Sequence, residues 1–260
     1  MERLPNINLD RKSVNMMFMS RIAEGGEAVI CRGFKPNSLI KIFVKPESHE
    51  YSDSFRVPLY PELIEMPENK LPKLEEIQKL GLEHSVLPLS TITMNKRLIG
   101  YEMTYDPDDK QLHGQNLSRE ELVHFLKQSK EILEYYKAHD ITYGDVNANN
   151  LLINRKTGQA KFCDIDNIRI GQYPIDVMGR DLKIYTILRG LDDSTDAYMH
   201  NIMVLRQLQN DKFRMLFEPV TWLVRKDFSK DLEDEAKEVL ESMREPKQFN
   251  GEYVVQYIKK

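Results

Sequence analysis

The chain has 260 residues, with 37 Lys and Arg against 41 Asp and Glu and a formal net charge of −4. This near balance argues against broad nucleic-acid binding, which needs a basic surface. The mix of 41% hydrophobic and 30% charged residues excludes disordered, collagen-like and coiled-coil chains. No run approaches the roughly 20 apolar residues of a membrane-spanning helix, and the first residues lack the apolar core of a signal peptide. With two cysteines, Cys31 and Cys163, we expect reduced thiols and a cytoplasmic location.

Short apolar runs separated by turn residues predict a β-rich first part of the chain. Residues 22–31 and 39–44 have the apolar clusters of strands that tight turns connect. Residues 86–89 and 98–103 return to the same character. Between these pairs, Pro72 suits the first turn of a short helix.

The second part of the chain has a mainly helical pattern. Ser118 followed by Glu121 is a capping-box pattern, and apolar residues at helical spacing extend it over residues 118–138. Two short strands at 151–153 and 160–163 are predicted to form a hairpin. Further helices are expected at 180–191, 196–218 and 230–244.

The sharpest chemical signal is a set of oxygen ligands around the predicted hairpin. Asn150 follows Asp145 on the loop before the hairpin, and Asp164 comes directly after it. Phosphoryl transfer needs such a set, because one carboxylate orients the attacking hydroxyl while an amide oxygen and a second carboxylate hold Mg²⁺. An aspartate and an asparagine at this spacing alone are more typical of a turn, so the hairpin and Asp164 carry the argument.

These residues resemble the catalytic loop and the metal-binding motif of protein-kinase-like enzymes. The bacterial eukaryotic-like Ser/Thr kinases are the most similar, with G-D-V-N-P-x-N where this chain has residues 144–150 and D-x-D where it has residues 164–166. Upstream, Gly25 and Gly26 resemble part of the glycine-rich loop of these enzymes, and Lys41 resembles the lysine that contacts the phosphates of ATP.

The resemblance spans about residues 16–191 and implies a two-lobed α+β fold. A lobe of residues 1–104, a small antiparallel sheet with one helix, would cover ATP. A larger, mainly helical lobe of residues 105–260 would carry catalysis, and the polar residues 106–110 would connect the two. The implied function is an ATP- and Mg²⁺-dependent phosphotransferase that phosphorylates Ser or Thr on protein.

The resemblance also implies roles for residues of the second lobe. Asp145 would orient the acceptor hydroxyl and take its proton, and Asn150 and Asp164 would hold Mg²⁺. Asp166 would either bind a second Mg²⁺ or cap a turn. Asp181 would begin the buried helix of this lobe and fix the catalytic loop.

In the first lobe, the resemblance implies a helix glutamate that pairs with Lys41. Glu75 and Glu76 are the candidates, and Glu76 is favoured because it lies nearer the apolar face of the helix. A hinge that contacts adenine would offer the carbonyl of Glu102 and the N–H of Thr104.

Several positions depart from the kinase pattern. Gly144 stands where regulated kinases have an arginine before the catalytic aspartate, and Asn147 stands where they have a lysine. Ala23 and Ala28 replace two of the loop glycines, which would weaken ATP binding. The segment 164–181 contains no Ser or Thr, so switching by Ser/Thr phosphorylation there is not expected.

Other functions therefore stay open. The altered glycine loop favours a pseudokinase that binds nucleotide and signals by shape. Asn147 and the short segment after Asp164 favour a small-molecule kinase of the aminoglycoside or choline type. Adenylyl transfer would use the same residues. The partners implied by the resemblance are a protein substrate and a metal-dependent phosphatase or a protein with a von Willebrand-type domain, with no nucleic acid and no membrane.

Overall fold

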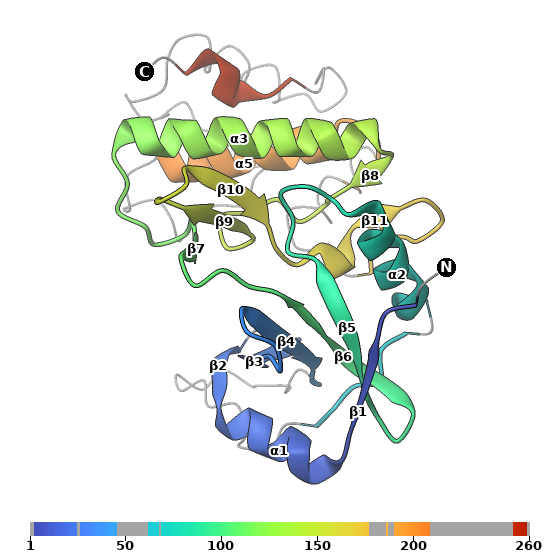
Figure 1. The fold of residues 1–260 in the computed structure, drawn as a ribbon. Helices are drawn as coiled ribbons and strands as arrows, with labels where there is room; N and C mark the ends of the chain where they lie inside the picture. The colour runs from blue at the N-terminus through green and yellow to red at the C-terminus, as the bar shows by residue number, and fades with distance from the viewer. Residues whose placement is uncertain are drawn as a thin grey trace, which may run out of the picture. The chain divides into compact units, whose positions relative to one another are not determined.

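The computed structural model describes residues 3–24, 27–45, 62–67, 69–176, 186, 190–208 and 252–258. The chain divides into two compact units, Met1–Pro107 and Asp108–Lys260. The division falls inside the polar segment 106–110 and not after residue 104. The predicted α+β class is confirmed (Figure 1). None of the described helices combines the length and the apolar character that crossing a membrane requires.

The first unit is built on a six-stranded sheet in the spatial order β1-β5-β6-β4-β3-β2. Its strands are β1 (Asn6–Leu9), β2 (Arg21–Glu24), β3 (Ala28–Arg32), β4 (Ser38–Phe43), β5 (Pro88–Met94) and β6 (Arg97–Thr104). All neighbours are antiparallel except β1 and β5, which run parallel, so the prediction of an antiparallel sheet is wrong at this edge. Because β1 and β5 lie far apart in the sequence, no local pattern could signal their pairing.

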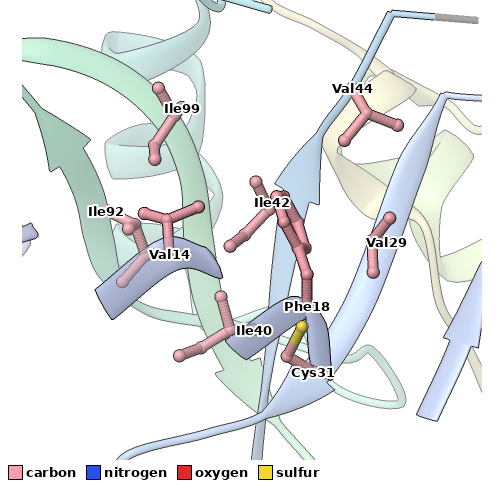
Figure 2. Packing of buried hydrophobic residues seen from close by; sticks show 9 residues of the cluster. All are labelled: Val14, Phe18, Val29, Cys31, Ile40, Ile42, Val44, Ile92 and Ile99. Atoms are coloured by element: carbon pink, nitrogen blue, oxygen red, sulfur yellow. The ribbon is translucent and has the colours of Figure 1, made fainter. Parts of the chain in front are cut away.

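Two helices accompany this sheet, where one was predicted. The helix α1 (Arg11–Met19) begins at Asp10, whose side chain accepts a hydrogen bond from the N–H of Ser13 at 2.7 Å. Val14 and Phe18 of α1 are fully covered and pack on one face of the sheet (Figure 2). The sheet residues of this cluster are Val29, Cys31, Ile40, Ile42, Val44, Ile92 and Ile99. The predicted helix, α2 (Lys70–Leu80), begins just before Pro72.

The strand β4 separates the two faces of the sheet. Ile40 and Ile42 point into the cluster beneath α1 and have no exposed surface (Figure 2). Successive side chains of a strand alternate between faces, so Lys41 and Phe43 lie on the opposite face and are half-buried. Gly100 of β6 lets the two strands approach, because a Cβ there would lie 2.2 Å from the carbonyl oxygen of Lys41.

The second unit combines helices with short strands. Its elements are β7 (Asp109–Gln111), α3 (Arg119–Ala138), β8 (Ile141–Thr142), β9 (Leu151–Asn154), β10 (Gln159–Phe162), the 3₁₀ turn η1 (Ile165–Asn167), β11 (Arg169–Ile170), α5 (Thr195–Leu208) and the 3₁₀ turn η3 (Val254–Tyr257). The strands form a sheet in the order β10-β9-β7 and a pair of β11 with β8.

Two predictions for this unit are confirmed in detail. Ser118 and Glu121 form the capping box at the start of α3, with each side chain bonded to the other's backbone N–H. The predicted hairpin is β9 and β10, joined by a turn in which Gly158 has a positive φ of 72°. The helix expected at 196–218 is α5, described as far as Leu208. The helices expected at 180–191 and 230–244 lie wholly or largely outside the described residues.

A buried carboxylate organises the turn between β3 and β4. The Oε1 of Glu102 accepts hydrogen bonds from the N–H groups of Phe34 and Lys35, at 2.8 and 3.0 Å, and from the hydroxyl of Ser38 at 2.7 Å. Its Oε2 accepts from the hydroxyl of Ser90 at 2.9 Å. Burial alone would raise the pKa of Glu102, but these four bonds outweigh burial and lower the pKa below its ordinary value.

We therefore predict that Glu102→Gln lowers the free energy of unfolding by about 1–3 kcal/mol at pH 7, because it weakens a fully buried, charge-assisted network. The folded pKa lies below the unfolded value, so this contribution is present above the unfolded pKa and is lost as the pH falls through the folded pKa. Urea unfolding at pH 7 and at pH 3.5 should show the gap between the two proteins shrinking in acid. The exposed Glu83→Gln is the matched control. A gap that does not change with pH would contradict the role given to the charge.

Candidate functional site

The loop 143–150 carries the predicted catalytic residues, and Asn147 gives it its shape. The Oδ1 of Asn147 accepts hydrogen bonds from the N–H groups of Asn149, at 2.9 Å, and Asn150, at 3.2 Å. A side chain that bonds the backbone two and three residues ahead closes a tight turn. This turn brings the side chain of Asn150 back to Asp145.

The carboxylate of Asp145 is oriented by two amides. Its Oδ2 accepts from the Nδ2 of Asn150 at 2.8 Å, and its Oδ1 accepts from the Nδ2 of Asn147 at 3.1 Å. Since the Nδ2 of Asn150 is engaged with Asp145, the Oδ1 of that amide is the atom suited to a cation. Asn147, which stands where the kinase resemblance expects a lysine, is therefore a neutral group that positions Asp145.

Asp164 is tied to the same loop through the residue before it. The N–H of Cys163 donates to the carbonyl of Asn150 at 2.9 Å, which fastens the end of β10 to the loop. Asp164 itself has φ 59° and ψ 33°, in the left-handed region that costs free energy for a residue other than glycine. Such strain collects at functional positions. Asp166 is 2% exposed, and a carboxylate so buried is stable as an anion only beside donors or cations.

Tyr143, the first residue of the loop, connects the loop to the end of β10. It is 1% exposed, its ring stacks with that of Tyr136 and lies tilted against that of Phe162, and its hydroxyl donates a hydrogen bond to the carbonyl of Cys163. Burial raises the pKa of Tyr143 well above its ordinary value, and the charges of Cys163, Asp164 and Asp145 add to the effect. The predicted catalytic carboxylate, Asp145, and the predicted metal ligand, Asp164, thus both raise the pKa of this phenol.

Asp196, in the first turn of α5, holds the backbone of the loop. Its Oδ2 accepts from the N–H of Tyr143 at 2.7 Å, and its Oδ1 accepts from the N–H of Gly144 at 2.8 Å. The sequence had assigned the fixing of this loop to Asp181, which lies outside the described residues, so Asp196 is the aspartate seen to do it. An aspartate in a first helical turn is ordinary helix chemistry, and no local signal marked it.

In the first unit, Lys41 lies on β4, and the two glutamates proposed as its partner lie on α2. The buried face of α2 is formed by Lys70, Lys73 and two apolar residues, Leu74 and Ile77. Glu76 lies at the flank of that face, and its carboxylate pairs with Lys79 at 3.5 Å, so the expected pair of Glu76 with Lys41 stays a prediction. Glu75 is half-buried on the same helix.

The proposed hinge contacts do not fit the strand β6. The N–H of Thr104 already donates to the carbonyl of Leu87 at 2.9 Å. Glu102 lies opposite Ile40 on one side and Ser90 on the other, so its backbone belongs to the ladders of a central strand. The two residues expected to meet adenine instead hold the sheet together.

Gly25 and Gly26 lie outside the described residues, so the glycine loop stays a prediction. Within the described ranges, no group of three or more His, Cys, Asp or Glu side chains is arranged to hold a metal ion. Asn150 and Asp164 would supply only part of a coordination sphere, which substrate phosphates and water usually complete for Mg²⁺. No family model matches the chain, and a search of curated proteins finds no match.

Burial raises the pKa of Asp196 from 3.8 to about 6, although the N–H groups of Gly144 and Tyr143 lower it. A protonated carboxyl cannot accept both N–H groups well, so we predict that below about pH 6 the loop opens locally more often while Asp196 stays buried, although protonation stabilises the fold against global unfolding. Hydrogen exchange at the amides of Tyr143 and Gly144, corrected for the intrinsic pH dependence, should show reduced protection at pH 5 relative to pH 7.5. Asp196→Asn should show the loss at both pH values and cost about 1–3 kcal/mol of stability.

The raised pKa of Asp196 also determines how this residue's contribution to the free energy of unfolding changes with pH. The folded pKa lies above the unfolded one, so the folded state keeps a proton that the unfolded state loses, and this group's contribution falls as the pH rises from about 4 to about 6. Asp196→Asn should remove that fall. The exposed Asp193→Asn is the control. Equal protection of the two amides at both pH values in the wild type would contradict the assignment.

Proposed function

We propose that this protein is a phosphotransferase that moves the γ-phosphoryl group of ATP to a hydroxyl group, with Ser or Thr of a protein as the acceptor. The single observation that carries the proposal is the set of hydrogen bonds that connects Asp145, Asn150 and the residue before Asp164. Asn150 donates to the Asp145 carboxylate, and its backbone carbonyl holds the N–H of Cys163, the neighbour of Asp164.

These residues offer the groups that phosphoryl transfer needs. Asp145 would orient the acceptor hydroxyl and take its proton, while the acceptor oxygen forms a bond to the γ-phosphorus and the bond to ADP breaks. The oxygen of Asn150 and the carboxylate of Asp164 would hold Mg²⁺, which when bound neutralises charge that develops on the phosphates. Lys41 would contact the phosphates with its ammonium group.

The order of elements in the first unit supports the same proposal. The predicted glycine segment lies between β2 and β3, Lys41 lies on β4, and α2 follows before β5 and β6. That is the order which the resemblance to protein kinases implies. Two observations depart from the kinase pattern: Glu76 pairs with Lys79, and the N–H of Thr104 is engaged within the sheet.

The test uses the purified full chain with Mg²⁺ and ATP labelled in parallel at the γ- and α-phosphate, with generic acceptor proteins. We predict γ-label on protein, and a loss of about 100-fold or more in Asp145→Asn and Asn150→Ala, because proton transfer and positioning each contribute on this scale. Asn149→Ala is the matched control, since the side chain of Asn149 is exposed. Thermal unfolding must show that all variants fold.

The other outcomes identify the alternatives. Label from the α-phosphate would replace phosphoryl transfer with adenylyl transfer. Binding of nucleotide without transfer to protein would overturn the protein-kinase assignment, and a screen of metabolite and antibiotic acceptors would then separate a small-molecule kinase from a pseudokinase. The replacement of two loop glycines by Ala23 and Ala28 is the observation that favours the pseudokinase as second candidate.

A further inference from the structure

A short segment of the second unit, residues 252–258, packs against the two long helices. It includes the 3₁₀ turn η3, is drawn in red in Figure 1, and contacts both α3 and α5. Four of its side chains are buried there, those of Tyr253, Val254, Val255 and Ile258. The segment is therefore docked on the helices through its side chains.

The side chain of Asn201, on α5, holds the backbone of this segment. Its Nδ2 donates to the carbonyl of Glu252 at 2.8 Å, and its Oδ1 accepts from the N–H of Val254 at 2.6 Å. Asn201 is fully covered, so both bonds form away from water. Hydrogen bonds to the backbone of a segment supply affinity, while pockets for its side chains supply specificity. Because the two bonds lie on either side of Tyr253, they fix the position of that residue.

The ring of Tyr253 is held between α3 and α5. It meets the ring of His200, on α5, edge-on with 5.1 Å between the ring centres. The Nζ of Lys130, on α3, is 5.8 Å from the centre of the tyrosine ring, within the reach of cation–π attraction. His200 is fully covered, and its Nε2 is 2.9 Å from the Oγ of Ser129 on α3. The tyrosine therefore packs against side chains that are themselves fixed.

Tyr253 also lies beside the carboxylate that holds the loop 143–150. One small cavity is lined by Tyr253, by Asp196 and by Thr142 of β8, the strand that leads into the loop. Burial raises the pKa of Tyr253, and the charge of Asp196 adds to the effect. The segment 252–258 thus places an aromatic ring next to the anchor of the candidate catalytic loop.

We propose that the segment 252–258 is a strap that controls the order of the loop 143–150 by keeping water away from Asp196. With the strap docked, Asp196 is 7% exposed and accepts the N–H groups of Tyr143 and Gly144. Such bonds are stronger where water is excluded. When the strap is released, water competes for the carboxylate and the loop opens more often. A partner that draws the strap away would then lower catalysis, a consequence that rests on the proposed function.

Hydrogen exchange of the full chain at pH 7.5 tests the coupling. Tyr253→Ala removes the ring, and Asn201→Ser removes the amide that holds the strap. We expect each to reduce the protection of the Tyr143 and Gly144 amides about 10-fold or more, since truncating a buried side chain costs at least this much in stability. Amides within the hairpin of β9 and β10 should change less than about 2-fold, because the opening is local.

Two further variants and one combination serve as controls. Gln256→Ala, at an exposed position of the strap, and Tyr253→Phe, which keeps the ring, should both retain the protection of the wild type. Tyr253→Ala combined with Asn201→Ser should lose no more protection than the more affected single variant, because both changes release the same strap.

Unchanged protection of the two loop amides in Tyr253→Ala and Asn201→Ser would overturn the inference. An equal loss across the hairpin would also overturn it, because the segment would then only stabilise the second unit as a whole. If Tyr253→Ala does not fold, Tyr253→Leu removes the ring, keeps apolar bulk and takes its place in the same test. Failure of the proposed function is distinct: protection of the loop would depend on the strap, while no label would be transferred from ATP.

Discussion

The arrangement of the candidate site depends on one buried carboxylate, Asp196. Two consecutive N–H groups, those of Tyr143 and Gly144, point at its two oxygens from a stretch of backbone that belongs to no helix and, at these residues, to no strand. Buried N–H groups without a partner are costly, so the loop takes the path on which this carboxylate satisfies both. The free energy gained from the two bonds offsets the cost of burying the charge, which is why the pKa rises to about 6 and no further.

A series of hydrogen bonds connects the backbone that Asp196 holds to the candidate catalytic residues. Tyr143 connects the anchored backbone to the carbonyl of Cys163, and Cys163 connects the end of β10 to Asn150. Asn150 then orients Asp145. Each of these groups is bonded to a neighbour that is itself bonded, and such supporting contacts fix the geometry of a functional site. Next to this series, Asp164 adopts a left-handed backbone conformation that costs free energy.

In the first unit, the two faces of one sheet carry different kinds of side chain. The face beneath α1 is apolar and closely packed, and it contains Ile40 and Ile42 (Figure 2). The opposite face of the same strand carries Lys41 and Phe43. Glu102 binds the turn before β4 to β6, so the strand that bears Lys41 is held by a buried ion and by apolar contacts together. Residues that the kinase resemblance assigns to adenine are used here for the sheet.

The sequence by itself determined the local features, because their causes lie within a few residues. The capping box at Ser118, the hairpin after the loop 143–150 and the short spacing from Asp145 to Asn150 could all be predicted, and the structure bonds these last two side chains together. Tertiary structure alone decided which distant groups meet. The parallel pairing of β1 with β5, the bonds of Asp196 to the loop and the bonds of Glu102 to the turn before β4 join residues 50 or more positions apart. The face that α2 turns inward was also settled by packing, since a helix with both lysines and glutamates can bury either.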